Sequence, residues 1–268
     1  MKEIATPSTT KYILEKYHLN ALKKYGQNFL IDVNIINKIV TSAKIDQTTA
    51  VIEVGPGIGA LTQVLGRYSG KVTSFEIDER FMPVYQEFLN QDNIEIIFGD
   101  FMEQDIKPIV DQLKQRYQKV CLVANFPYYI TTAIIEKVVL GNFGIDEMIV
   151  MVQKEVALKM TGIYKNPLLL MIKDMGTIEY LFTVNKNVFM PAPHVDSAIL
   201  KIELKKAPGL KLYEVLNICF KQRRKTILNN LKQSYEEAEE ILLQTGIENR
   251  KRSEELELAD FKNITKMI

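Results

Sequence analysis

Short runs of β-branched and other apolar residues alternate with stretches of helical length along the first part of the chain. The runs lie at residues 51–54, 72–77, 94–98, 120–123 and 148–152. The stretches between them lie at residues 61–68, 81–90, 105–117 and 131–140. Strands and helices that alternate at this interval are typical of a doubly wound parallel sheet. We therefore predict an α/β fold with a Rossmann-like sheet.

The pattern changes in the last third of the chain. Two further β-like runs, at 180–184 and 198–204, flank a loop that contains prolines, and we expect them to add an antiparallel edge to the sheet. From residue 212 onward, apolar residues recur only at the three- and four-residue spacing of helices. The sequence thus predicts two domains, 1–207 with the sheet and a basic N-terminal extension, and 208–268, which is small and all-α.

Composition places the chain among ordinary globular proteins. It has 268 residues, of which 47% are hydrophobic, enough for one sizeable domain and a smaller one. It has no apolar stretch of about 18 residues and no signal-peptide layout at its start, so we expect a cytoplasmic protein that does not enter a membrane. Cys121 and Cys219 lie in separate apolar runs without neighbouring ligands, which favours reduced core thiols and predicts no metal site.

The net charge of +1 hides a basic stretch at residues 201–232. This stretch carries nine basic and two acidic side chains, a local charge of +7. Within it lie Lys221, Arg223, Arg224 and Lys225. A polyanion such as RNA is one partner that this charge fits, and a solvated helix face is the other interpretation, which the charge alone leaves open.

A glycine turn follows the first predicted strand, in the segment Val51-Ile-Glu-Val-Gly-Pro-Gly-Ile-Gly59. Gly55 and Gly57 allow the backbone to approach a ligand closely, and the helix that follows offers free amide donors. We expect a nucleotide-like ligand there. The same spacing also fits the dinucleotide fingerprint, so at this point an NAD enzyme remains an alternative.

Carboxylates end the next two predicted strands. Glu76 ends the second strand, where its carboxylate can accept hydrogen bonds from both hydroxyls of a ribose. Asp100 follows the third strand, where it can accept a hydrogen bond from an adenine amino group. A series of acidic residues at strand ends favours a nucleotide site over a glycine turn that serves packing alone.

The fourth predicted strand ends in the segment Val123-Ala-Asn-Phe-Pro-Tyr-Tyr129. An exocyclic amine is a poor nucleophile because its lone pair is delocalised into the ring. The oxygens of Asn125 and of the carbonyl beside Pro127 can accept its two hydrogens and orient the lone pair, while Tyr128 can stack on a flipped base. This segment indicates methylation of an amino group. The NAD alternative gives it no role and lacks residues for hydride transfer.

With these motifs the chain resembles the ribosomal RNA adenine dimethyltransferases. The resemblance covers nearly the whole chain and includes Tyr25-Gly-Gln-Asn-Phe-Leu-Ile-Asp32, Met151-Val-Gln-Lys-Glu-Val156, Phe189-Met-Pro-Ala-Pro-His-Val-Asp-Ser197 and Arg223-Arg-Lys-Thr-Ile-Leu-Asn-Asn230. It implies S-adenosylmethionine as the cofactor. The residues then expected to bind it are Asn28, Leu30, Gly55, Gly57, Glu76, Asp100 and Asn125.

The resemblance also implies a substrate and further site residues. Phe189 would face the target base opposite Tyr128, so the expected catalytic group is Asn125, Pro127, Tyr128 and Phe189. The basic residues Lys221, Arg223, Arg224 and Lys225 would bind RNA phosphates. The implied reaction is dimethylation of two adjacent adenines near the 3′ end of small-subunit rRNA, by a monomer acting on a pre-ribosomal particle.

Two departures from the family pattern keep alternatives open. Phe126 replaces a common leucine, and residues 162–170 form a shorter, altered loop that lies near the RNA side in the family. One alternative is a large-subunit rRNA methylase of the macrolide-resistance type, against which the segments 189–197 and 223–230 count. The other is an RNA-binding relative without catalysis, against which the intact Asn125, Pro127 and Tyr128 count.

Overall fold

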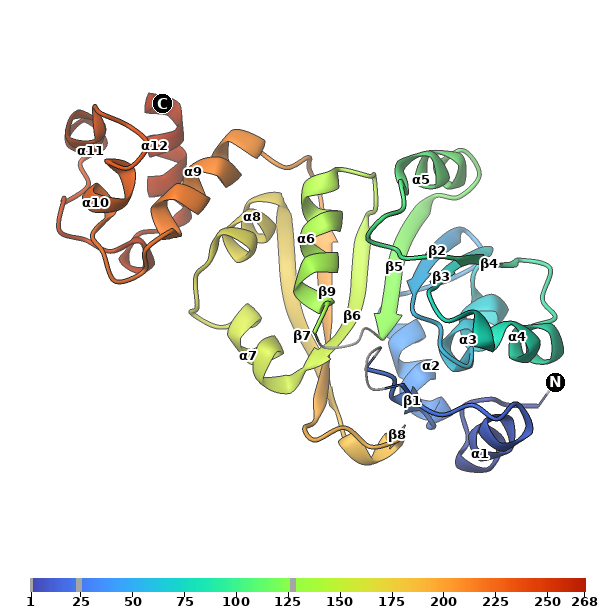
Figure 1. The fold of residues 1–268 in the computed structure, drawn as a ribbon. Coiled ribbons are helices and arrows are strands. Elements are labelled where there is room, and N and C mark those ends of the chain that lie inside the picture. The colour runs from blue at the N-terminus through green and yellow to red at the C-terminus, as the bar shows by residue number, and fades with distance from the viewer. Residues whose placement is uncertain (1, 23–25, 126–128) are drawn as a thin grey trace. The chain divides into compact units, whose positions relative to one another are not determined.

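The computed structural model describes residues 2–22, 26–125 and 129–268, and its chain forms two compact units (Figure 1). The first unit comprises residues 1–158 and 178–203. The second comprises residues 159–177 and 204–268. The second unit therefore includes the segment 159–177, which the division expected from the sequence had assigned to the sheet domain.

The centre of the first unit is a mixed sheet of seven strands. The strands are β2 (Thr49–Val54), β3 (Lys71–Glu76), β4 (Ile94–Phe98), β5 (Lys119–Asn125), β6 (Glu147–Gln153), β7 (Gly176–Val184) and β9 (Ser197–Leu204). Their order is β4-β3-β2-β5-β6-β9-β7. The pairs among β2 to β6 are parallel, and β9 runs antiparallel to β6. This arrangement confirms the predicted α/β sheet with an antiparallel addition.

Helices connect the parallel strands (Figure 1). They are α3 (Ala60–Tyr68), α4 (Met82–Phe88), α5 (Lys107–Lys114) and α6 (Thr131–Gly141), with the 3-10 turn η2 (Glu79–Phe81) before α4. All six residues of β2 are buried, as expected for a central strand covered on both faces. Strand β3, the next along the chain, pairs with β2 on one side, and β5 pairs with β2 on the other, so the strand order changes direction at β2. Ligands of such sheets bind at this switch point, at the carboxyl ends of the strands.

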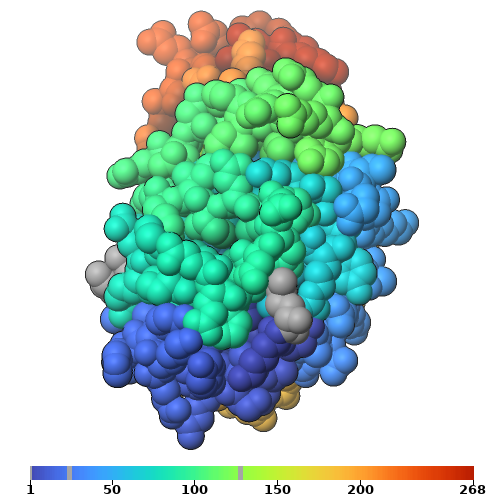
Figure 2. Space-filling model, turned by 90° about the vertical axis from the view of Figure 1, so that its right-hand side faces the viewer, coloured from blue at the N-terminus to red at the C-terminus, as the bar shows by residue number. Residues whose placement is uncertain are grey.

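The N-terminal region is more structured than its sequence pattern indicated. It forms α1 (Pro7–Lys16) and α2 (Val33–Ser42), and each begins at a polar cap. Thr6 accepts a hydrogen bond from the Thr9 amide at 3.2 Å, and Asp32 accepts one from the Asn34 amide at 2.8 Å. In Figure 2 the dark blue N-terminal segment borders the blue-green surface near α4, where Lys16 of α1 pairs with Glu87 at 2.5 Å.

A small two-stranded ladder joins two distant motifs. Strand β1 (Phe29–Leu30) pairs antiparallel with β8 (Phe189–Met190), and Leu30 lies opposite Phe189. The turn η3 (Lys186–Val188) leads into β8. The ring of Phe29 packs edge-on against Phe81 with centroids 5.9 Å apart. The ladder therefore anchors the N-terminal motif in the core of the first unit.

The second unit is helical. It contains α8 (Pro167–Met175), α9 (Leu210–Phe220), α10 (Ile227–Leu231), α11 (Ala238–Thr245), η4 (Ser253–Glu255) and α12 (Leu258–Met267), while α7 (Lys154–Thr161) spans the division. Phe220 and Phe261 pack in its core with ring centroids 5.6 Å apart. Asp174, whose side chain is 6% exposed, pairs there with Lys206 at 3.0 Å and with Lys262.

Membrane-spanning helices and metal clusters are both absent from the described part of the chain. No helix within 2–22, 26–125 and 129–268 is long and apolar enough to span a bilayer. Within the same residues, no three His, Cys, Asp or Glu side chains are grouped so that they would hold a metal ion.

Candidate functional site

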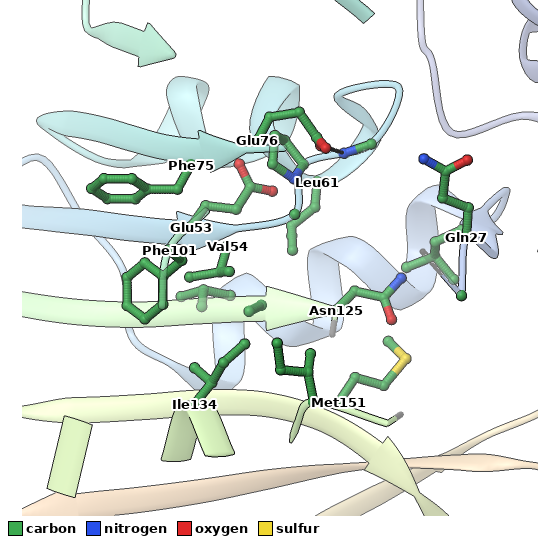
Figure 3. A pocket seen from close by; sticks show the side chains of 18 of the residues that line it. Gln27, Glu53, Val54, Leu61, Phe75, Glu76, Phe101, Asn125, Ile134 and Met151 are labelled. Carbon is green, nitrogen blue, oxygen red and sulfur yellow. Dashed lines mark hydrogen bonds between the residues drawn. The ribbon is translucent and has the colours of Figure 1, made fainter. Parts of the chain in front are cut away.

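A cavity of the first unit lies at the carboxyl ends of the strands (Figure 3). Its walls come from the ends of β2, β3, β5 and β6, the turn after β4, and the β1–β8 ladder. The structure brings eight of the residues expected from the sequence into this one cavity. They are Asn28, Leu30, Gly55, Gly57, Glu76, Asp100, Asn125 and Phe189.

The glycine turn after β2 has a backbone conformation that residues with a side chain rarely adopt. Gly55 and Gly57 have φ angles of +69° and +58°. A Cβ at Gly57 would in addition lie 3.3 Å from the ring of Phe29. The Gly57 amide donates a hydrogen bond to Glu76 Oε2 at 3.0 Å. The turn is thus held against both β3 and the N-terminal motif.

Glu76 ends β3 with its carboxylate on the cavity wall (Figure 3). Its Oε1 accepts a hydrogen bond from the Asp78 amide at 2.9 Å. The hydroxyl of Tyr85 donates to the Gly57 carbonyl at 2.6 Å and lies 3.5 Å from Glu76 Oε2. Tyr85 could not be singled out from the sequence, because a tyrosine at a buried helix position normally serves packing.

A second carboxylate, Glu53, lies in the cavity wall from β2 and is buried. Its Oε2 accepts hydrogen bonds from Thr62 Oγ1 at 2.7 Å and Ser74 Oγ at 2.6 Å. Burial raises the pKa of Glu53 to about 7, against the lowering effect of these two hydroxyls. Glu53 was not among the residues expected from the sequence, although a charged residue inside an otherwise apolar strand is a signal that could have identified it.

Burial also raises the pKa of Glu76 to about 7, although the amides of Asp78 and Gly57 oppose the rise. A ribose donates hydrogen bonds most strongly to the ionised carboxylate. A ribose bound to Glu76 would therefore favour the ionised form, and its binding would release a proton at pH below 7.

We accordingly expect the affinity for a ribose-containing cofactor to rise as the pH increases from about 6 to 8, and to change little above that range. Calorimetric titration across this pH range measures it. The rise should disappear in a Glu76→Gln variant and persist in Glu53→Gln. If the rise instead persisted in Glu76→Gln and disappeared in Glu53→Gln, Glu53 would be the group that titrates with binding.

The turn after β4 forms a further part of the wall, next to the end of β3. Asp100 lies in this turn, and its Oδ1 accepts a hydrogen bond from the Met102 amide at 2.8 Å. Phe101 is buried and packs edge-on against Phe75 with centroids 5.3 Å apart. The carboxylate of Asp100 is therefore fixed by its own turn.

Asn125 is the last residue of β5 and pairs with Met151 of β6, and Figure 3 shows the two side chains next to each other. Its Nδ2 donates to the Asn28 carbonyl at 3.4 Å, a contact that links the reaction motif to the N-terminal motif. Phe189 is buried, with 4% of its surface exposed, and borders the same cavity. The other expected catalytic residues, Pro127 and Tyr128, lie outside the described residues, and their roles stay predictions.

The expected RNA-binding residues lie in the second unit. Lys221, Arg223, Arg224 and Lys225 are all exposed. Arg223 is also engaged within its own unit, because its Nε donates to Glu254 Oε1 at 2.8 Å and its Nη1 to the Tyr164 hydroxyl at 3.0 Å. Tyr164 belongs to the loop that departs from the family pattern, so this loop is tied to the basic segment.

Together, the parallel sheet, the glycine turn at its switch point and the acidic residues at the strand ends define a nucleotide-cofactor protein of the doubly wound α/β class. Residues 18–268 match the family described as Ribosomal RNA adenine dimethylase. The chain belongs to this family. The sequence-based identification of the family is thereby confirmed.

Proteins with similar sequences match this chain over almost its full length. The Ribosomal RNA small subunit methyltransferase A of Oceanobacillus iheyensis is 39% identical over 280 residues, which span 98% of this chain and 95% of that protein. The protein of the same name from Staphylococcus aureus strain Newman is also 39% identical, over 98% of this chain and 95% of its own length.

Two solved structures share the fold. A dimethyladenosine transferase from Plasmodium falciparum matches with a TM-score of 0.70 and 25% identity, over 88% of this chain and 95% of its own. The 23S rRNA methyltransferase ErmE matches with a TM-score of 0.67 and 26% identity, over 89% of this chain and 98% of its own.

Proposed function

We propose that the protein transfers methyl groups from S-adenosylmethionine to the exocyclic amino groups of two adjacent adenines near the 3′ end of small-subunit rRNA. The observation that carries this proposal is the shared cavity: Asn125 of the reaction motif borders the same space as Glu76 and Asp100. The small subunit is favoured because relatives named for it are 39% identical, whereas the 23S rRNA enzyme ErmE is 26% identical. The protein acts as a monomer on a pre-ribosomal particle.

The residues of the cavity fit S-adenosylmethionine. Gly57 leaves room for close approach of the cofactor, Glu76 accepts hydrogen bonds from the ribose, and Asp100 accepts one from the adenine amino group. Asn28 and Leu30 border the cavity from the N-terminal motif. When bound, S-adenosylmethionine supplies an activated methyl group.

Asn125 prepares the target nitrogen for attack. Because its Nδ2 donates to the Asn28 carbonyl, Oδ1 is the atom of this amide that accepts a hydrogen from the target amine. That hydrogen bond favours a pyramidal nitrogen with its lone pair directed at the methyl group. The chain thus contributes orientation and electrostatics, and needs no strong base.

The exposed basic segment of the second unit binds RNA phosphates. We expect the double change Arg224→Ala and Lys225→Ala to weaken RNA binding and to reduce the slope of log affinity against log salt by roughly 1.5, since two phosphate contacts are lost. Filter binding at several salt concentrations measures this slope. The double change Lys107→Ala and Arg116→Ala, at exposed positions of the first unit, removes the same charge and serves as the control. Equal slopes for both variants would argue against a basic RNA surface at 221–225.

The test of the proposed function offers unmethylated small and large ribosomal subunits separately, with S-adenosylmethionine labelled in its methyl group. Label in the small-subunit RNA is the expected result. Label confined to the large subunit would favour the activity named for ErmE. Cofactor binding without any transfer would favour an RNA-binding relative that lacks catalysis.

A further inference from the structure

The side chain of Lys137, on α6, ends inside the turn that follows β4. Its Nζ donates hydrogen bonds to the carbonyl oxygens of Phe101 at 2.9 Å, Met102 at 2.8 Å and Gln104 at 2.7 Å. A lysine ammonium has three N–H donors, so these three carbonyls use all of them. The Nζ of Lys137 also lies 5.3 Å from the centroid of the Phe101 ring.

The turn depends on this ammonium for its shape. Carbonyl dipoles that converge on one point repel one another unless a cation or several donors lie between them. The turn is also held at its start, where the Gly99 amide donates to the Glu76 carbonyl at 2.8 Å. Beyond that point its bonds include local ones: Asp100 accepts from the Met102 amide at 2.8 Å, the Glu103 amide donates to the Asp100 carbonyl at 3.0 Å, and the Gln104 amide donates to the Phe101 carbonyl at 3.3 Å. Without Lys137, three partly buried carbonyls would lose this donor, and the turn would rearrange to reach water.

The same turn forms the wall of the cofactor cavity. Gly99, Asp100, Phe101 and Met102 all border the cavity. Ile134, one helical turn before Lys137 on α6, borders it too, and Figure 3 shows Ile134 and Phe101 on the same side of the pocket. The ammonium therefore joins two adjacent parts of one wall.

We propose that Lys137 is a positioning residue that holds the turn in the shape with which Asp100 recognises the 6-amino group of the cofactor's adenine. This inference rests on the proposed function, because it takes Asp100 as the acceptor for that amino group. Lys137 contacts neither the methyl group nor the target base. Its loss should act on cofactor selection and leave the chemical step nearly unchanged.

The test compares the dissociation constants of S-adenosylhomocysteine and S-inosylhomocysteine, in which a carbonyl oxygen replaces the amino group. We expect the unchanged protein to prefer the adenosine compound, because the inosine compound offers Asp100 no donor at that position. In Lys137→Met the adenosine compound should bind about tenfold more weakly, and the preference should fall about tenfold. The kcat at saturating cofactor should stay within about twofold.

Lys107→Met is the matched control, because Lys107 lies at the start of α5 and its ammonium pairs with Asp111 on the same exposed helix face. A Lys137→Cys variant alkylated with 2-bromoethylamine regains an ammonium at nearly the same length and should regain the preference. The same treatment of the unchanged protein controls for reaction at Cys121 and Cys219, which are both buried.

The outcomes separate the two proposals. A preference for adenosine that survives in Lys137→Met, or that the alkylated cysteine does not restore, would overturn the role of Lys137 alone. An unchanged protein that binds both compounds equally would overturn the role of Asp100 in the proposed function. Faster hydrogen exchange of the amides at 101–104 in Lys137→Met, without a change elsewhere in the sheet, is the structural result that the inference predicts.

Discussion

Replacing Asn125 by alanine is expected to slow methyl transfer by roughly 10²- to 10³-fold, the usual loss when one well-placed polar group is removed from a reaction site. The reason is geometric. Asn125 ends β5 on the cavity wall, its Nδ2 donates to the Asn28 carbonyl, and in the proposed mechanism its Oδ1 holds the target amine. Single-turnover transfer to small-subunit RNA, with cofactor saturating, measures the loss directly.

Cofactor binding in the same variant should change only a fewfold, because Glu76, Asp100 and the glycine turn remain. Calorimetric titration with S-adenosylhomocysteine checks this point. Asn263→Ala is the control, since Asn263 is exposed on α12 in the other unit. Near-normal turnover in Asn125→Ala would remove the basis for assigning the reaction to this motif.

Replacing Glu76 by alanine is expected to weaken cofactor binding by about 10²-fold or more, because two hydrogen bonds to a carboxylate are lost and each contributes about 1.5–3 kcal/mol. The loss includes the support that Glu76 gives to the Gly57 and Asp78 amides at the cavity wall. Affinity for S-adenosylmethionine and the dependence of transfer rate on its concentration are the measurements.

Glu79→Ala is the matched control, because Glu79 is an exposed carboxylate three residues along the same segment. Thermal unfolding of both variants tests whether the fold survives. If the folded Glu76→Ala protein bound the cofactor as tightly as the unchanged protein, the cofactor would have to lie elsewhere in the cavity.

The convergence of the expected cofactor residues was predictable because it follows from backbone topology. The carboxyl ends of parallel strands share one edge of a sheet, so Gly55, Glu76 and Asn125 had to meet there once the strands were recognised. The register agrees, since Val54 lies opposite both Phe75 and Ala124. Periodicity was enough to find those strands.

Contacts that depend on side-chain direction were not predictable. Tyr85 and Lys137 occupy helix positions that look like ordinary packing and surface sites in the sequence, yet they hold Gly57 and the turn at 101–104. The segment 159–177 lies with the helical unit through tertiary packing that periodicity does not encode. Arg223 was expected to bind RNA phosphate, and because it bonds to Glu254 and Tyr164 a phosphate would have to compete with these partners.

The proposed function requires that one cavity dimethylates two adjacent adenines of small-subunit rRNA. Its most direct test is to digest small-subunit RNA after reaction with the protein and S-adenosylmethionine, and to identify the modified nucleotides by mass. We predict N6,N6-dimethyladenosine at two neighbouring positions near the 3′ end, and none in reactions with Asn125→Ala. Modification at a single isolated adenine, at another base, or only in large-subunit RNA would contradict this function.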